Sequence, residues 1–146
     1  MASAYRDNSI KIFSISTKGY VIENLLEFEE ISNLQILYIK FSQNINYFIV
    51  SDSLRLQIFD MTKNKWIHQL EDVFTGSIHC MDITSNDKYL ICGTENALEI
   101  FDMQSGYKVR CFKMKFPAII LNITSKESKE NMCWITLCNN KIKAFN

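Results

Sequence analysis

An all-β fold built from repeated units is predicted by three features of this 146-residue sequence. Short segments alternate apolar and polar residues with the period of two that a half-buried strand requires. Stretches rich in Asp, Asn and Ser, which favour turns, separate these segments. One arrangement also recurs at intervals of about 44 residues, a period typical of repeat architectures. Together these features predict a chain of antiparallel strands.

A phenylalanine closes one strand in every unit of the repeat. The segments that end on it are "IKIF", "LQIF", "LEIF" and "IKAF", closed by Phe13, Phe59, Phe101 and Phe145. Apolar residues at alternate positions place one face of each strand towards a core. A polar turn precedes each segment, and before that turn lie "ASAY", "FIVS", "LICG" and "WITL". Each pair of segments is therefore expected to form a hairpin.

Two further strands complete the unit. After the first three anchors a turn leads into "YVIENLLEF", "WIHQLEDV" and "YKVRCFKM", and Gly19, Asn64 and Gly106 in these turns tolerate positive φ. Before the last three hairpins lie "LQILYIKF", "SIHCMDIT" and "AIILNIT". Four short antiparallel strands per unit are typical of a propeller blade. We therefore expect residues 1–146 to form a single incomplete β-propeller segment, with blade units at approximately 1–30, 31–74, 75–117 and 118–146.

The segment 20–31 is the one place where a helix competes with a strand. Its apolar residues also fit helical spacing, and it contains good helix formers without a breaker. The equivalent segments of the other units carry Trp66, Ile67, Val109 and Phe112, which favour strand. Its place in the repeat therefore favours a strand.

The two complete units resemble WD-repeat blades. The resemblance rests on "ILYIKFSQNINYFIVSDSLRLQIFDMTKNKWI" and "SIHCMDITSNDKYLICGTENALEIFDMQSGYKV", in which a Phe-Asp pair stands where that family has Trp-Asp. The sequence departs from the family at the preceding hairpin, where Asp7 fits the family's aspartate but Ser53, Glu95 and Asn139 replace it elsewhere. The family's Gly-His pair is also missing before the third unit. Its histidine–tryptophan network therefore cannot form, and we expect the blades to depend more on apolar packing between sheets.

The units amount to about three and a half blades, fewer than a closed ring requires. The chain is therefore expected to be an excerpt of a larger propeller protein, with the missing blades supplied by the same parent protein or by a second chain. Sixteen basic and 16 acidic residues give no positive field for nucleic acid. No apolar run is long enough for membrane insertion, and no signal peptide is present, so we expect an intracellular, cytoplasmic protein.

Residue patterns for catalysis or metal binding are not found in the sequence. His68 and His79 fall in different units, and the five cysteines lack zinc-ligand spacing. Phosphate-loop and hydrolase motifs are also missing. We therefore expect no enzyme activity, cofactor or metal, and a non-catalytic scaffold for protein–protein interaction. The alternative is a non-catalytic propeller portion of a larger enzyme or enzyme complex, which positions a substrate or partner.

The resemblance also implies which face binds partners. In WD-repeat proteins the loops that join the outermost strand to the next blade, and the second strand to the third, share one face that commonly holds partners. Phe74 is either an apolar anchor for a partner or a residue packed against a neighbouring blade. The residues expected on this face are Arg6, Asp52, Arg55, Phe74, Thr75, Thr94 and Glu95.

Overall fold

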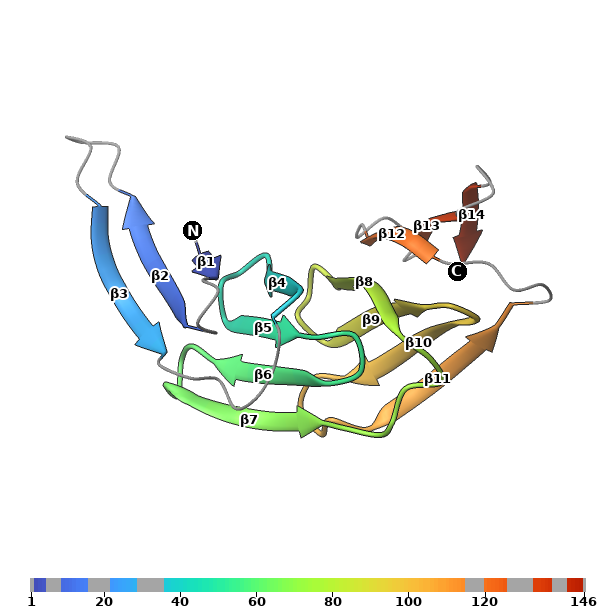
Figure 1. The fold of residues 1–146 in the computed structure, drawn as a ribbon, viewed down its shortest axis with the longest axis horizontal. Helices are drawn as coiled ribbons and strands as arrows, with labels where there is room; N and C mark the ends of the chain where they lie inside the picture. Colours follow the sequence, from blue (N-terminus) through green and yellow to red (C-terminus); the bar gives the residue numbers. More distant parts are fainter. Residues whose placement is uncertain are drawn as a thin grey trace.

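The described residues form four antiparallel β-sheets that follow one another along the chain (Figure 1). The structure, a computed structural model, describes residues 2–4, 9–15, 22–28, 36–114, 120–125, 133–137 and 142–145. Regular structure in these ranges consists of strands without a helix. Accordingly, the described part of the chain has no helix of the length and apolarity needed to span a membrane. The all-β prediction is confirmed.

Each sheet is a simple meander in which strands adjacent in sequence are neighbours. The first sheet contains β1 (Ala2–Ala4), β2 (Ile10–Ile15) and β3 (Ile22–Phe28). The second contains β4 (Tyr38–Phe41), β5 (Tyr47–Ser51), β6 (Leu56–Asp60) and β7 (Lys65–Leu70). The third contains β8 (Ile78–Ile83), β9 (Tyr89–Thr94), β10 (Ala97–Asp102) and β11 (Lys108–Lys113). The fourth contains β12 (Ile120–Ser125), β13 (Cys133–Leu137) and β14 (Ile142–Phe145).

The described part of the segment with helical spacing, Ile22–Phe28, forms β3, so the prediction of a strand there is confirmed. Turn chemistry also agrees with the sequence, because Asn64 has a φ of 51° and Gly106 a φ of 74°. Only a glycine fits at position 106 without strain, since an added Cβ would lie 2.7 Å from Nδ1 of His68. Gly19 lies outside the described residues.

The aspartate of each Phe-Asp pair holds the turn that follows it. Oδ1 of Asp60 accepts hydrogen bonds from the backbone N–H groups of Thr62 (2.9 Å) and Lys63 (3.0 Å). Asp102 does the same for Gln104 (3.1 Å) and Ser105 (2.8 Å). Short polar side chains that bond to the backbone two or three residues ahead stabilise such turns. The repeated dipeptide thus fixes the path from the third strand to the outermost one.

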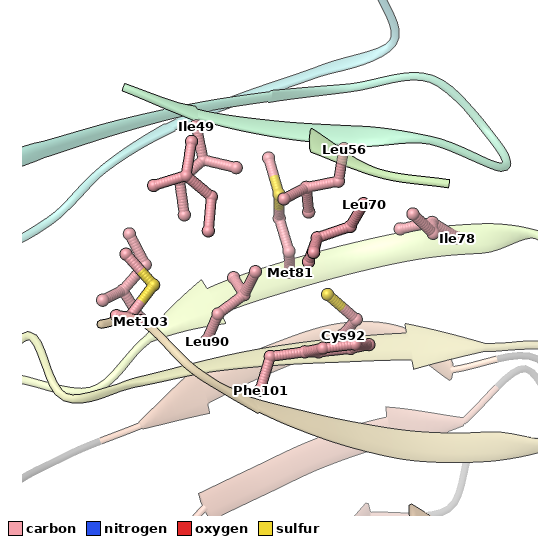
Figure 2. Close-up of a cluster of buried hydrophobic side chains, with 11 residues drawn as sticks. Ile49, Leu56, Leu70, Ile78, Met81, Leu90, Cys92, Phe101 and Met103 are labelled. Atoms are coloured by element: carbon pink, nitrogen blue, oxygen red, sulfur yellow. The ribbon is translucent and has the colours of Figure 1, made fainter. Parts of the chain in front are cut away.

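An apolar core lies between the second and third sheets (Figure 2). All five residues of β6 are buried, which means that both faces of this strand are covered. A strand with one solvated face would instead show alternating burial. The buried members of this core are Ile49, Leu56, Ile58 and Leu70 from the second sheet, and Ile78, Met81, Ile83, Leu90, Cys92, Phe101 and Met103 from the third sheet and the turn after β10.

A second core covers the other face of the second sheet. There Ile10 and Ile12 of β2 pack with Phe48, Val50 and Phe59 of β5 and β6. The second sheet is therefore packed face to face between the first and third sheets. Each fully buried aliphatic or aromatic side chain of this kind stabilises the fold by about 2 kcal/mol.

Polar contacts also connect the second and third sheets along their length. Nζ of Lys40 on β4 lies 2.9 Å from Oδ1 of Asp82 on β8. At one end, the Asn46 side chain donates a hydrogen bond of 3.0 Å to Oδ2 of Asp87. Along the outer strands, Nε2 of His68 on β7 lies 3.0 Å from the backbone oxygen of Gln104. The first contact joins the two inner strands, and the last joins an outer strand to the turn after β10.

Candidate interaction surface

The predicted binding residues that the structure describes lie at one end of the second and third sheets. They belong to the turn from β5 to β6, the connection from β7 to β8, and the turn from β9 to β10. In a meander these connections share one end, here called the predicted face. A hydrogen bond of 2.6 Å from the Ile78 N–H to the Ser53 oxygen brings the two sheets together there. Arg6 lies outside the described residues.

Asp52 and Arg55 bind each other within the hairpin, and Asp52 also binds its backbone. Oδ1 of Asp52 accepts hydrogen bonds of 2.7 Å from the N–H groups of both Leu54 and Arg55. Its other oxygen lies 3.0 Å from both Nε and Nη2 of Arg55, so the guanidinium forms a two-pronged ion pair. A carboxylate used in this way holds a turn rigidly. The pair therefore holds the tip of the hairpin, where Leu54 is 57% exposed.

Thr75 lies in the connection between β7 and β8 and forms hydrogen bonds with a buried carboxylate. Its N–H and its hydroxyl donate hydrogen bonds of 2.8 Å and 2.6 Å to Oε1 of Glu99. Glu99, on β10, is 0% exposed. Nζ of Lys108 on β11 lies 2.5 Å from Oε2, as an ion pair without good hydrogen-bond geometry, and also donates to the backbone oxygen of Val73. A buried charge requires such partners.

The triad of Thr75, Glu99 and Lys108 revises one expectation from the sequence. The family's histidine–tryptophan network was expected to be missing, and apolar packing was expected to replace it. In the third sheet a different polar network is present, together with the apolar core. It connects the loop before the first strand, the third strand and the outermost strand.

Phe74 packs inward. Its ring centroid lies 5.2 Å from that of Phe101, and the side chain contacts the core between the second and third sheets while remaining half-buried. Such aromatic pairs add about 1 kcal/mol to the burial of their area. Of the two interpretations of Phe74, packing against a neighbouring sheet is therefore the one that its contacts favour.

Thr94 and Glu95 differ in their exposure. Thr94 is buried, and its hydroxyl exchanges hydrogen bonds of 3.2 Å with the backbone of Ala97. Glu95 is half-exposed, and its Oε1 lies 4.0 Å from Nε2 of His79. Its side chain also lies beside Gly76, so the turn after β9 meets the connection before β8. The structure thus brings Thr75 and Glu95 into one region of the predicted face.

The two histidines of the described residues lie apart from each other. No cluster of three His, Cys, Asp or Glu side chains in these ranges is placed to hold a metal ion. His68 contacts the turn after β10, whereas His79 contacts the turn before it, at opposite ends of the sheet. Burial raises the pKa of the Cys92 thiol well above its ordinary value, so this buried cysteine is a neutral core residue.

Neither a protein-family model nor a curated protein matches this sequence. Sequence reasoning missed Glu99 and Lys108, which lie between apolar neighbours on β10 and at the start of β11. A signal for Glu99 was nevertheless present, because the same register position is polar in every unit, as Lys11, Gln57, Glu99 and Lys143.

Proposed function

We propose that this chain is a segment of a WD-repeat-like β-propeller that serves as a non-catalytic scaffold for protein–protein interaction. The observation that carries the proposal is the face-to-face packing of repeated antiparallel meanders, in which the second sheet is covered on both sides. Successive blades of a propeller are covered by their neighbours in this way. The inner strands β4 and β8 face each other through Lys40 and Asp82, which agrees with strands placed around a common axis.

A scaffold needs rigid loops and exposed contact residues on those loops. The predicted face has rigid loops and exposed residues. The Asp52–Arg55 pair and the Thr75–Glu99 hydrogen bonds hold two of its loops. Leu54 at the tip of the first loop and Glu95 in the turn after β9 are exposed. We propose these two residues as partner contacts. Rigid loops on a packed framework are the usual location of binding residues.

The experiment is a quantitative pull-down of partners with three variants of the protein. Leu54→Glu and Glu95→Arg change exposed side chains of the predicted face, whereas Tyr107→Glu changes a residue at the opposite end that is still more accessible, at 76% exposed. We expect the first two variants to lose partners and the third to keep them, with all three folded by circular dichroism. Equal recovery by all variants would contradict the choice of face. Enzymatic turnover that depends on His79 would contradict the non-catalytic function.

A further inference from the structure

The connection between β7 and β8, residues 71–77, lies against β10 and β11 and is here called the strap. It contains no strand residue, and four of its seven residues are exposed. Phe74 packs on Phe101 while remaining half-buried, and Nζ of Lys108 lies 5.6 Å from the centroid of the Phe101 ring. A loop that buries little surface opens at a lower free-energy cost than the strands around it. The strap therefore has the features of a segment that opens while both sheets stay folded.

The polar contacts of the strap with β10 and β11 end on one ion pair. The N–H and the hydroxyl of Thr75 both donate to Oε1 of Glu99. Nζ of Lys108 lies 2.5 Å from the other carboxylate oxygen, and it also donates to the backbone oxygen of Val73. Val73 and Thr75 are thus held in place by the same two side chains.

The neighbouring loop of the predicted face is held differently. In the turn from β5 to β6, Asp52 binds both the side chain and the N–H of Arg55, three residues further along the same turn. The strap is instead held by residues that follow Thr75 by 24 positions and Val73 by 35. The turn can keep its shape through its own residues, whereas the strap depends on an ion pair outside itself.

We propose that the strap opens and closes as one unit, that the Lys108–Glu99 pair holds it closed, and that the predicted face binds partners in the closed form. The inference rests on the proposed interaction function and adds a means of controlling it. On opening, water solvates the separated charges, which offsets part of the contacts that are lost. The closed strap also lies beside Glu95, because a Cβ added at Gly76 would be 3.6 Å from Oε2 of that residue. Opening therefore separates two neighbouring loops of the face.

The first test is native-state hydrogen exchange of the unmodified protein in low concentrations of urea. Local opening exposes little surface, so its free energy depends weakly on urea, whereas that of global unfolding depends strongly on urea. We expect the Thr75 amide to exchange at least about tenfold faster than the most protected amides of β9, with the weak urea dependence. Exchange of the Thr75 amide only with the strong dependence of global unfolding would overturn the proposal.

The second test changes the ion pair. Lys108→Met should speed exchange of the Thr75 amide by a further factor of about ten or more, whereas Lys108→Arg retains the positive charge and should keep the slower exchange. Lys113→Met, which changes an exposed lysine of the same strand, is the matched control. The Arg55 amide, which donates to Asp52, should be unchanged in all three variants. Equal Thr75 rates in Lys108→Met and Lys113→Met would refute the role of the pair, and so would an equal rise at Thr75 and Arg55.

A pull-down separates the role of the strap from the choice of face. The double variant Glu99→Leu and Lys108→Met removes both charges, so that no carboxylate is stranded, but it leaves the strap unheld. We expect this variant to lose the partners that Leu54→Glu loses, and Lys108→Arg to keep them. Full recovery by the double variant, with loss in Leu54→Glu, would refute the role of the strap and leave the face intact. Full recovery by both Leu54→Glu and Glu95→Arg would instead refute the face, whereas the exchange rates alone decide whether the strap opens.

Discussion

Asp60 shows how one side chain can stabilise a turn in a pH-dependent way. Burial alone would raise its pKa, but hydrogen bonds from Lys63 and Thr62 outweigh burial and hold the pKa well below its ordinary value. The folded carboxyl therefore binds its proton less readily than the unfolded one. Its contribution to stability is present at neutral pH and is lost as the pH falls below about 4.

We expect Asp60→Asn to lower the free energy of unfolding at pH 7 by about 1 to 2 kcal/mol, the cost of weakened hydrogen bonds to a charged group. It should also flatten the loss of stability below about pH 4. Urea unfolding across a pH series measures both effects. Asp102→Asn is the comparison: hydrogen bonds from Ser105 also lower the pKa of Asp102, but this carboxyl is more exposed, so we expect a smaller effect of the same sign. A pH dependence that is unchanged in Asp60→Asn would show that this carboxylate is not responsible.

Ile45 has a backbone conformation that is costly for its residue type. Its φ is 58°, in the left-handed region, and its side chain is 62% exposed. The equivalent turn of the next sheet has Asp87 with a φ of 56°. A branched side chain raises the cost of the left-handed region, whereas Asn and Asp enter it more easily. Little apolar burial would be lost on replacing this isoleucine.

Ile45→Asn should therefore stabilise the fold by about 1 kcal/mol. The reverse change at the equivalent position, Asp87→Ile, should destabilise it by more, because it also removes the acceptor for the Asn46 side chain. Thermal and urea unfolding of the two variants provide the comparison. Destabilisation by Ile45→Asn would indicate that Ile45 makes contacts that outweigh its backbone strain.

At the level of elements, the triad of Thr75, Glu99 and Lys108 joins a loop to two strands through a buried carboxylate. Removing one partner of a buried ion pair leaves an uncompensated charge, and we expect Lys108→Met to destabilise the fold by about 3 kcal/mol. The double variant Glu99→Leu and Lys108→Met should be more stable than Lys108→Met alone, because the stranded carboxylate is then absent. Urea unfolding of Lys108→Met, Glu99→Leu and the double variant completes the cycle. Additive losses would show that the two charges are not coupled.

The strands could be predicted from sequence because their signals are local. Alternation around Ile58 and the turn after Asp60 each depend on residues within a few positions, and comparison between units decided between helix and strand for β3. The contacts of the predicted face could not be predicted in this way. Thr75 forms a hydrogen bond with Glu99, which lies 24 residues further along the chain. Phe74 packs inward because its ring contacts that of Phe101. Such pairs depend on how sheets are placed, which the repeat alone does not specify.

For the whole molecule, stacking of the sheets is the source of the core. The two buried clusters lie between sheets, so a single sheet of this chain would leave one of its apolar faces exposed. Stability of such an array resides in the contacts between neighbouring repeats. This explains why the sequence keeps apolar residues on both faces of β6.

The most direct test of the propeller proposal is a crystal structure of the protein. We expect the inner strands β4, β8 and β12 to lie around one axis, with the sheets radiating from it and Lys40 beside Asp82 on adjacent inner strands. A structure in which the four sheets stack without a common axis, or in which β4 and β8 lie apart, would contradict the account.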